Sequence, residues 1–183
     1  IKRAMDVVGS LVLIVLTSPI MLGVAIGVKL SSPGPIIFKQ ERIGLNKKPF
    51  MMYKFRSMRV NVQQETGWSK DYDPRKTHFG SFIRKFSLDE LPQFFNVLNG
   101  SMSLVGPRPP LPKEVEKYTP YQMHRLDAKG GITCYWQCSG RSNIMFDEWV
   151  ELDLKYIRDR SISTDAKILA KTAVAVLRRD GAE

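Results

Sequence analysis

Two adjacent acidic residues, Asp89 and Glu90, lie between clustered cations and are the residues best suited to carry chemistry. Arg84 and Lys85 come just before them, and Arg108 follows within a Pro-Arg-Pro-Pro segment. An ionised aspartate can attack phosphorus to form an aspartyl phosphate, and a neighbouring glutamate can hold Mg²⁺ near a diphosphate. Arginine binds phosphate through two donors at once, and prolines stiffen a loop before it binds. The pattern therefore predicts phosphoryl-transfer chemistry.

The same acids allow a purely structural interpretation. Ser87 and Glu90 have the spacing of a capping box, in which side chains satisfy the first N–H groups of a helix. That helix would cover residues 91–98 and end at the Asn-Gly pair that follows. Pro92 fits poorly into a helix that starts at Ser87, so we expect the helix to start later or to bend and expose the acids. Its N–H groups and dipole would keep Asp89 ionised and favour a nearby phosphate.

A second segment with binding character covers residues 131–143. It combines Tyr135 and Trp136 with Gln137 and Arg141. Aromatic faces beside an amide and a guanidinium can hold a base or a sugar. Tyrosine and tryptophan pack in protein cores more often than they bind ligands, so this segment alone is a weak indication of a binding site.

The elements that position these residues are predicted to be mainly helical with a small β hairpin. Residues 36–38 and 49–55 have strand character and flank a turn rich in Gly, Asn and Lys. Residues 60–76 are polar and aperiodic, which predicts a loop that closes over substrate. Apolar residues at helical spacing predict three more helices and a capped C-terminal helix: residues 79–86, 115–128, 146–158 and those following the cap at 163–165. Any basic amphipathic helix here could lie in a membrane interface or could cover the core with a solvated face.

An uncharged run from residue 7 to residue 28, flanked by basic residues, predicts a membrane segment. As one straight helix it would be about 33 Å long, barely enough for a hydrocarbon core of about 30 Å. Pro19 divides it into arms of about 18 and 15 Å, each suited to one leaflet. Because basic flanks stay cytoplasmic, we expect a re-entrant helical hairpin that bends at Ser18-Pro19, with a kinked spanning helix as the alternative. The Thr17 and Ser18 hydroxyls could satisfy carbonyls freed at the bend.

The composition restricts the function classes. The chain has 183 residues and a net charge of +10, which favours a membrane surface, a nucleic acid or a phosphorylated substrate as partner. The apolar fraction of 43% excludes a polytopic membrane protein, which leaves a membrane segment at 1–30 and a membrane-associated catalytic domain at 31–183. Because the first residue is Ile1, we expect the chain to be the C-terminal part of a longer one. Cys134 and Cys138 are expected to be reduced thiols.

Several long motifs follow one another along nearly the whole chain. They are Lys2-Arg3 with Asp6, Ser18-Pro19, residues 48–58, residues 83–98, Gly106-Pro107-Arg108-Pro109, and Gly131-Ile132-Thr133 with Gln137 and Gly140-Arg141. In this order they resemble the polyprenyl-phosphate sugar-1-phosphate transferases, the monotopic phosphoglycosyl transferases that are also called bacterial sugar transferases.

The resemblance implies transfer of a hexose-1-phosphate from a UDP-sugar to a polyprenyl phosphate such as undecaprenyl phosphate, with release of UMP. The reaction would occur at the cytoplasmic face of the bacterial inner membrane, as the first membrane step of polysaccharide assembly. Asp89 would be the nucleophile of a ping-pong reaction, and Asp89 and Glu90 would hold Mg²⁺, with Mn²⁺ as the alternative. The implied substrate-binding residues are Arg84, Arg108, Arg141 and Gln137, with Lys54 and Arg56 as weaker candidates. Homo-oligomerisation is compatible with the sequence.

The sequence departs from a common family pattern at Gly130, Cys134 and Cys138, near the expected nucleotide pocket, and leaves galactose and glucose as the expected sugars. Two other function classes fit parts of the chain. A membrane-anchored nucleic-acid-binding module would explain the positive charge, but acids in such a cleft repel phosphate, so we expect no nucleic-acid partner. A non-catalytic scaffold for polysaccharide assembly would show no nucleotide turnover.

Overall fold

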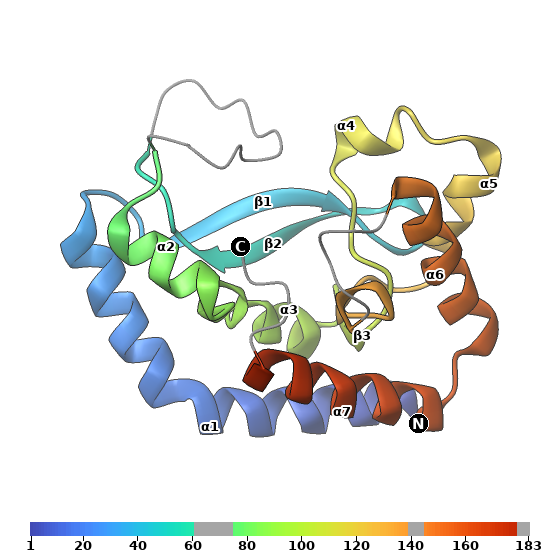
Figure 1. The fold of residues 1–183 in the computed structure, drawn as a ribbon, viewed down its shortest axis with the longest axis horizontal. Helices are drawn as coiled ribbons and strands as arrows, with labels where there is room; N and C mark the ends of the chain where they lie inside the picture. Colours follow the sequence, from blue (N-terminus) through green and yellow to red (C-terminus); the bar gives the residue numbers. More distant parts are fainter. Residues whose placement is uncertain (61–74, 139–144, 179–183) are drawn as a thin grey trace.

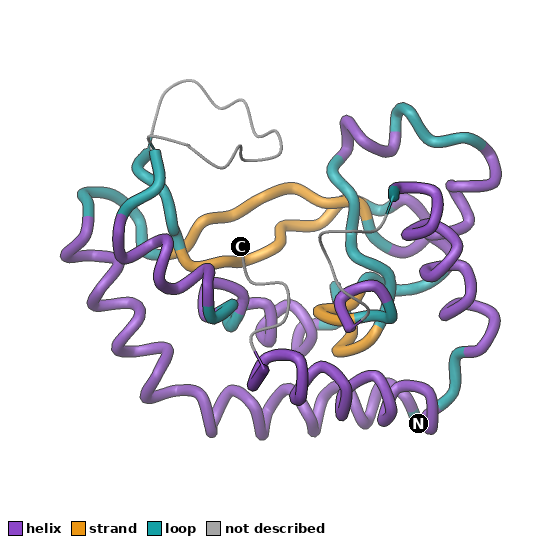
Figure 2. Tube along the Cα trace, in the orientation of Figure 1, coloured by secondary structure: helices purple, strands orange, loops and turns teal. Residues whose placement is uncertain are grey.

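The computed structural model describes residues 1–60, 75–138 and 145–178. As predicted, the described chain is mainly helical, with a small antiparallel hairpin (Figure 2). The helices are α1 (Lys2–Ser31), α2 (His78–Lys85), α3 (Gln93–Asn99), α4 (Pro112–Val115), α5 (Pro120–Met123), α6 (Phe146–Asp159) and α7 (Ile162–Arg178). Four short 3₁₀ turns join them: η1 (Leu45–Lys47), η2 (Leu88–Glu90), η3 (His124–Asp127) and η4 (Trp136–Cys138).

Two small sheets complete the fold. Strands β1 (Ile37–Ile43) and β2 (Pro49–Phe55) form the hairpin, while β3 (Ser103–Val105) and β4 (Gly131–Thr133) form a short parallel pair that the sequence analysis did not predict. In Figure 1, α1 runs along one side of the molecule, the hairpin lies across the other side, and α2 and α3 lie between them. The start of α7 meets the start of α1, where Lys2 Nζ and Asp165 Oδ2 lie 2.6 Å apart.

Helix α1 is one continuous helix that bends part of the way along its length (Figure 1). Pro19 lies within it and cannot donate to the carbonyl of Val15, four residues earlier. The Ser18 hydroxyl donates to that carbonyl at 2.8 Å, and the Thr17 hydroxyl donates to the Leu13 carbonyl at 2.7 Å. The expected compensation of the carbonyl freed by Pro19 is therefore confirmed for the Ser18 hydroxyl. The two arms are not separate helices, and the topology of α1 in a membrane stays a prediction.

The first turns of α1 are fastened to the rest of the molecule by polar contacts. Asp6 is buried and accepts hydrogen bonds from the Ser103 hydroxyl and the Leu104 amide, both at 3.0 Å. Arg3 donates to the Val97 and Leu98 carbonyls in the last turn of α3 at 2.6 and 2.8 Å, where a helix has fewer amides to satisfy its carbonyls. Gly100, at φ 91°, ends α3 as the sequence predicted.

The second half of α1 is held by apolar packing, since Val24 and Val28 pack with Phe55 and Ile83. Both halves of the helix thus contact the same folded body. Nevertheless, α1 exposes a row of large apolar side chains: Val8, Leu11, Val12, Val15, Leu16, Ile20, Leu22, Ile26 and Leu30. Its mean hydropathy of 2.5 and its length would allow it to cross a membrane. An exposed apolar surface of this extent indicates an apolar partner outside the chain.

The hairpin is joined to α3 through one buried amide. Asn96 is 1% exposed; its Oδ1 accepts from the Tyr53 amide at 2.9 Å, and its Nδ2 donates to the Met51 carbonyl at 2.8 Å. The side chain therefore satisfies the free edge of β2 in place of a further strand. This contact fixes the strand that carries Lys54 relative to the helix that follows Glu90.

Residues 115–128 do not form the single helix that the sequence analysis predicted. Pro120 starts α5 after a break, because the residue before a proline is driven out of the helical region and proline has no N–H. Thr119 is extended, with ψ 161°, and its hydroxyl caps α5. The C-terminal helix starts at Ile162, with the Ser161 hydroxyl accepting from the Thr164 amide, so the predicted cap at 163–165 was one turn too late. Most of the predicted loop at 60–76 lies outside the described residues.

We predict that Asp6→Ala lowers the free energy of unfolding by roughly 2–4 kcal/mol, because it leaves the Ser103 hydroxyl and the Leu104 amide buried without an acceptor. Thermal and denaturant unfolding in detergent micelles measures this loss. Asp6→Asn retains one acceptor oxygen and should cost less than half as much. A stability of Asp6→Ala within about 0.5 kcal/mol of the unchanged chain would contradict the anchoring role.

Candidate active site

The two acids lie on a separate turn before α3. Ser87, at φ 53°, occupies the left-handed region, which is strained for a residue other than glycine. It makes no side-chain capping bond, so the predicted capping box is absent. Pro92 is the N-cap of α3, which confirms that the helix starts later. The acids are not both exposed as expected, because Asp89 is only 8% exposed.

The environment of Asp89 disfavours its charged form. Burial, and then the neighbouring carboxylate of Glu90, raise the pKa of Asp89 from 3.8 to about 6, although Lys54 and Arg84 act in the opposite direction. Desolvation thus opposes the helix dipole that was expected to keep this group ionised, since η2 is a single turn. With a pKa of about 6, the carboxyl is still mostly ionised at neutral pH. A carboxylate with a raised pKa between charged neighbours is typical of catalytic sites.

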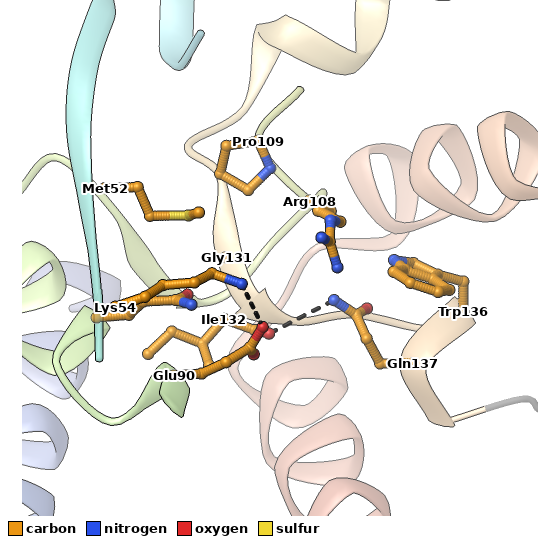
Figure 3. Close-up of a pocket in the computed structure, with 10 residues that line it drawn as sticks. Met52, Lys54, Glu90, Arg108, Pro109, Gly131, Ile132, Trp136 and Gln137 are labelled. Atoms are coloured by element: carbon orange, nitrogen blue, oxygen red, sulfur yellow. Dashed lines mark hydrogen bonds and ion pairs between the residues drawn. The ribbon is translucent and has the colours of Figure 1, made fainter. Parts of the chain in front are cut away.

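Glu90 lies on the wall of a pocket and pairs with Lys54 of β2, with Nζ and Oε1 2.8 Å apart (Figure 3). This ion pair joins the hairpin to the acidic turn. Its side chains are 17% and 29% exposed, so water screens the pair only in part. Lys54 thus compensates the charge of Glu90 where two adjacent carboxylates would otherwise repel one another.

The pocket brings together four of the predicted site residues: Lys54, Glu90, Arg108 and Gln137 (Figure 3). The other lining residues are Met52, Gln93, Pro109, Gly131, Ile132 and Trp136. Sequence reasoning did not assign Met52 or Gln93 to the site. Their spacing could have indicated that they belong to the site. Met52 is two residues from Lys54 in a strand, and Gln93 follows Glu90 by three residues, so each lies on the same side as a predicted site residue.

Arg108 presents its guanidinium to the pocket. Its Cζ lies 5.8 Å from the centre of the Trp136 ring, and no hydrogen bond of this side chain to another described residue is found. The loop that carries it is fastened to β1: Arg42 donates to the Pro109 carbonyl at 2.9 Å, and the Ile43 amide donates to the Pro110 carbonyl at 2.9 Å. Burial, and then the charge of Arg108, lower the pKa of Arg42 to about 10. Sequence reasoning missed Arg42, because the loop residues that it contacts are far from it in the sequence.

Gln137 is 7% exposed, and its Nε2 donates to the Ile132 carbonyl at 3.4 Å (Figure 3). Its Oε1 and the Trp136 indole nitrogen are buried without a hydrogen-bond partner among the described residues. A donor and an acceptor of this kind, next to the pocket, are suited to a polar ligand because an unpaired buried polar group is costly.

The remaining predicted substrate-binding residues lie elsewhere. The charge of Arg84 acts on Asp89, but its side chain does not line the pocket. Arg56 is buried, and its guanidinium donates to the carbonyls of Ser32 and Pro33, both at 2.6 Å, so it fastens the end of α1 instead of lining the pocket. Arg141 lies outside the described residues.

Asp89 and Glu90 are suited to a metal ion that binds together with the phosphates of the substrate. Among the described residues there is no cluster of three or more acidic, histidine or cysteine side chains that could form a complete protein cage. Mg²⁺ is commonly held by one or two carboxylates together with substrate phosphates. Adjacent Asp89 and Glu90 provide that kind of donor set.

Known proteins resemble this chain over its whole length. It is 45% identical to the "Galactosyl transferase CpsE" of Streptococcus agalactiae over 195 residues, which cover 100% of this chain and 43% of that protein. It is 43% identical to the "Undecaprenyl-phosphate galactose phosphotransferase" of Salmonella typhimurium over 198 residues, which cover 100% of this chain and 41% of that protein. The "UDP-glucose:undecaprenyl-phosphate glucose-1-phosphate transferase" of Escherichia coli is 43% identical over 181 residues, with 94% of this chain and 39% of that protein covered.

The chain thus spans less than half the length of these relatives. The family model described as "Bacterial sugar transferase" matches residues 1–179, which include the acidic turn, the pocket and α1. The match to nearly the whole chain agrees with the resemblance that the sequence motifs carry, and this chain belongs to the bacterial sugar transferase family.

Proposed function

We propose that this chain transfers a hexose-1-phosphate from a UDP-sugar to a polyprenyl phosphate, releases UMP, and starts the assembly of a polysaccharide at the membrane. The observation that carries the proposal is the buried carboxylate of Asp89 next to Glu90, whose ion pair with Lys54 lies on the wall of a pocket that Arg108 lines as well. Asp89 itself is not among the residues that line this pocket. Relatives over the whole chain are named as transferases that act on undecaprenyl phosphate.

The reaction has two displacements at one phosphorus atom. The ionised carboxylate of Asp89 attacks the sugar-linked phosphorus, and the bond from that phosphorus to the bridging oxygen breaks as UMP leaves with the electron pair. A phosphate oxygen of the lipid then attacks the same phosphorus and displaces the aspartate, which recovers its charge. The product is a polyprenyl diphosphate that carries the sugar. Two steps let UMP leave before the bulky acceptor reacts.

Arg108 supplies the main cation for the nucleotide phosphates. Its guanidinium lies against an aromatic ring in the pocket wall, and it can bind a phosphate through two parallel hydrogen bonds. Glu90 and Asp89 would hold Mg²⁺, with Mn²⁺ as the alternative. When bound, such an ion neutralises diphosphate charge. Lys54 keeps Glu90 next to this charge and draws β2 against the acidic turn.

The arrangement of α1 supports a re-entrant membrane segment with the catalytic domain on the cytoplasmic face. Asp6 at its start and Val28 near its end both contact the same folded body, while the apolar face between them is exposed. A helix whose ends lie on opposite sides of a bilayer could not make both sets of contacts. This placement would keep the pocket near the headgroups, where a soluble nucleotide meets a lipid phosphate.

We propose galactose or glucose as the sugar. Two of the relatives described above are named for galactosyl or galactose transfer, and one for glucose-1-phosphate transfer.

We predict that the chain in lipid nanodiscs turns over UDP-galactose or UDP-glucose repeatedly only when polyprenyl phosphate and Mg²⁺ are present, and that without the lipid the release of UMP stops at about one per chain. Asp89→Asn should reduce turnover by at least about 10³-fold, because it removes the nucleophile with little change in volume. Asp127→Asn, at an exposed acid on η3 that does not line the pocket, is the matched control. Full turnover by Asp89→Asn, or no UMP from any UDP-sugar, would contradict the proposed function.

The raised pKa of Asp89 predicts the pH dependence of both activity and stability. Because the nucleophile must be ionised, kcat/KM for the UDP-sugar should fall as the pH drops through about 6. A carboxylate whose folded-state pKa is raised from 3.8 to about 6 stabilises the fold below pH 4, and that contribution is lost as the pH rises to 6. Asp89→Asn should therefore be more stable than the unchanged chain at pH 7.5, by up to about 3 kcal/mol, and equally stable at pH 4. A loss of stability of the same size at both pH values would show that Asp89 only holds the fold together.

The topology of α1 predicts that both of its ends are labelled from the cytoplasmic side. Single cysteines at Ile1 and Leu30, which are 93% and 82% exposed, are placed in a chain lacking Cys134 and Cys138. An impermeant maleimide should label both cysteines in inverted membrane vesicles and neither in intact spheroplasts. Labelling of one position in spheroplasts would show that the helix spans the membrane.

A further inference from the structure

A buried cation lies behind the pocket wall, on the side away from the catalytic acids. Arg125 of η3 is 1% exposed, and its Nε and Nη2 donate to Asp153 Oδ2 of α6 at 2.9 and 2.7 Å. Its Nη1 donates to the Tyr118 hydroxyl at 2.6 Å. Asp153 is fully buried, so the pair is removed from solvent. The proposed chemistry uses neither residue.

Arg125 is the inner end of a row of four groups that contact one another: Arg125, Trp149, Trp136 and Arg108. Its Cζ lies 4.6 Å from the centre of the Trp149 ring, closer than to the rings of Tyr118 or Phe146. The Trp149 and Trp136 rings are 4.8 Å apart between centres, with 43° between their planes. Arg108 lies over the outer ring, Trp136, at 5.8 Å. The order from the interior to the pocket is thus cation, ring, ring, cation.

Contact with the Trp136 ring constrains the Arg108 side chain without occupying its N–H donors. A guanidinium that contacts an aromatic face keeps its N–H groups in its own plane, where a phosphate can accept them. Trp136 can hold Arg108 in this way only if the indole is itself fixed, and η4, which carries it, is a single turn. Trp149, on the fourteen-residue helix α6, is the packing partner behind it.

The ion pair fixes Trp149 in turn. Asp153 follows Trp149 by one helical turn of α6, so the guanidinium that pairs with this carboxylate also lies against the Trp149 ring. Arg125 thus meets α6 twice, through the carboxylate of Asp153 and through the ring face of Trp149. A buried, doubly anchored guanidinium is far stiffer than a surface side chain because few of its rotamers are accessible.

We propose that Arg125, Asp153 and Trp149 are positioning residues for the donor nucleotide: they fix Trp136 and, through it, hold Arg108 in the orientation that binds the diphosphate of the UDP-sugar. This inference rests on the proposed function, because it takes the ligand of Arg108 to be that diphosphate. The acceptor lipid reacts after UMP has left, so the row acts on the first displacement and leaves the second unchanged.

The test compares substitutions within the row with one beside it. Trp149→Leu removes a ring from the row, whereas Trp149→Phe keeps a ring there. The double variant Arg125→Met with Asp153→Leu removes both buried charges together, so that no unpaired charge remains and the fold is retained. Phe146→Leu is the matched control: this ring contacts Arg125 and Trp149 at 5.8 and 5.9 Å but is not between them and the pocket.

Each variant is measured in nanodiscs for the Kd of UDP with Mg²⁺, for kcat/KM of each substrate, and for thermal unfolding. Trp149→Leu should raise the Kd of UDP and lower kcat/KM for the UDP-sugar by about tenfold, and the double variant by at least about threefold. Both should leave kcat/KM for polyprenyl phosphate unchanged. Trp149→Phe should restore most of the loss, and Phe146→Leu should stay within about twofold.

Loss confined to the nucleotide half-reaction supports the positioning role, because general loosening of the fold would lower both kcat/KM values together. If Trp149→Leu does not fold, the double variant decides the question. A folded row variant with an unchanged UDP Kd, or equal losses for both substrates, would overturn the inference while the unchanged chain still turns over. Absence of turnover by the unchanged chain would instead overturn the proposed function.

Discussion

The ion pair between Lys54 and Glu90 is the contact on which the arrangement of the site depends, because it joins the hairpin to the acidic turn on the wall of the pocket. It places the hairpin against the acidic turn and compensates one of two adjacent carboxylates. The other, Asp89, is left buried with a raised pKa. Asn96 fixes the same strand from the α3 side, so that Lys54 is positioned before any ligand arrives. The left-handed backbone of Ser87 and the desolvation of the Asp89 carboxylate are both unfavourable, and the surrounding packing compensates for them. Such unfavourable features are common at reactive sites.

Helix α1 connects this site to its surroundings. Its polar first turns contact α3 and β3, and its second half packs on α2 and β2, the elements on either side of the acidic turn. The apolar face left exposed requires an apolar environment, and the polar anchors set how far the catalytic domain can lie from it. The bend that makes this geometry available follows from one proline and two neighbouring hydroxyls. Helix α1 thus supports the elements around the acidic turn and also presents the apolar face that would contact a membrane.

Local patterns were sufficient to predict the hairpin, α2, α6, the end of α3 and the acidic pair with its basic neighbours. They failed where the outcome depends on residues far away in sequence. The parallel pair β3–β4 has three residues per strand and no local signature, and the buried partners of Asp6 and Arg42 come from distant segments. Arg56 carries a charge that suits phosphate, yet backbone carbonyls at the end of α1 surround it. The raised pKa of Asp89 was not predicted, because sequence shows a helix terminus but not the desolvation that opposes it.

The covalent role of Asp89 is the central claim, and intact-protein and peptide mass spectrometry test it most directly. The chain is mixed with UDP-galactose or UDP-glucose and Mg²⁺ without lipid acceptor, then quenched in acid and digested. The account predicts a hexose phosphate on the peptide that contains Asp89, its loss when polyprenyl phosphate is added before the quench, and one UMP released per adduct. An unmodified peptide from an enzyme that turns over when lipid is added, or an adduct on another residue, would contradict it.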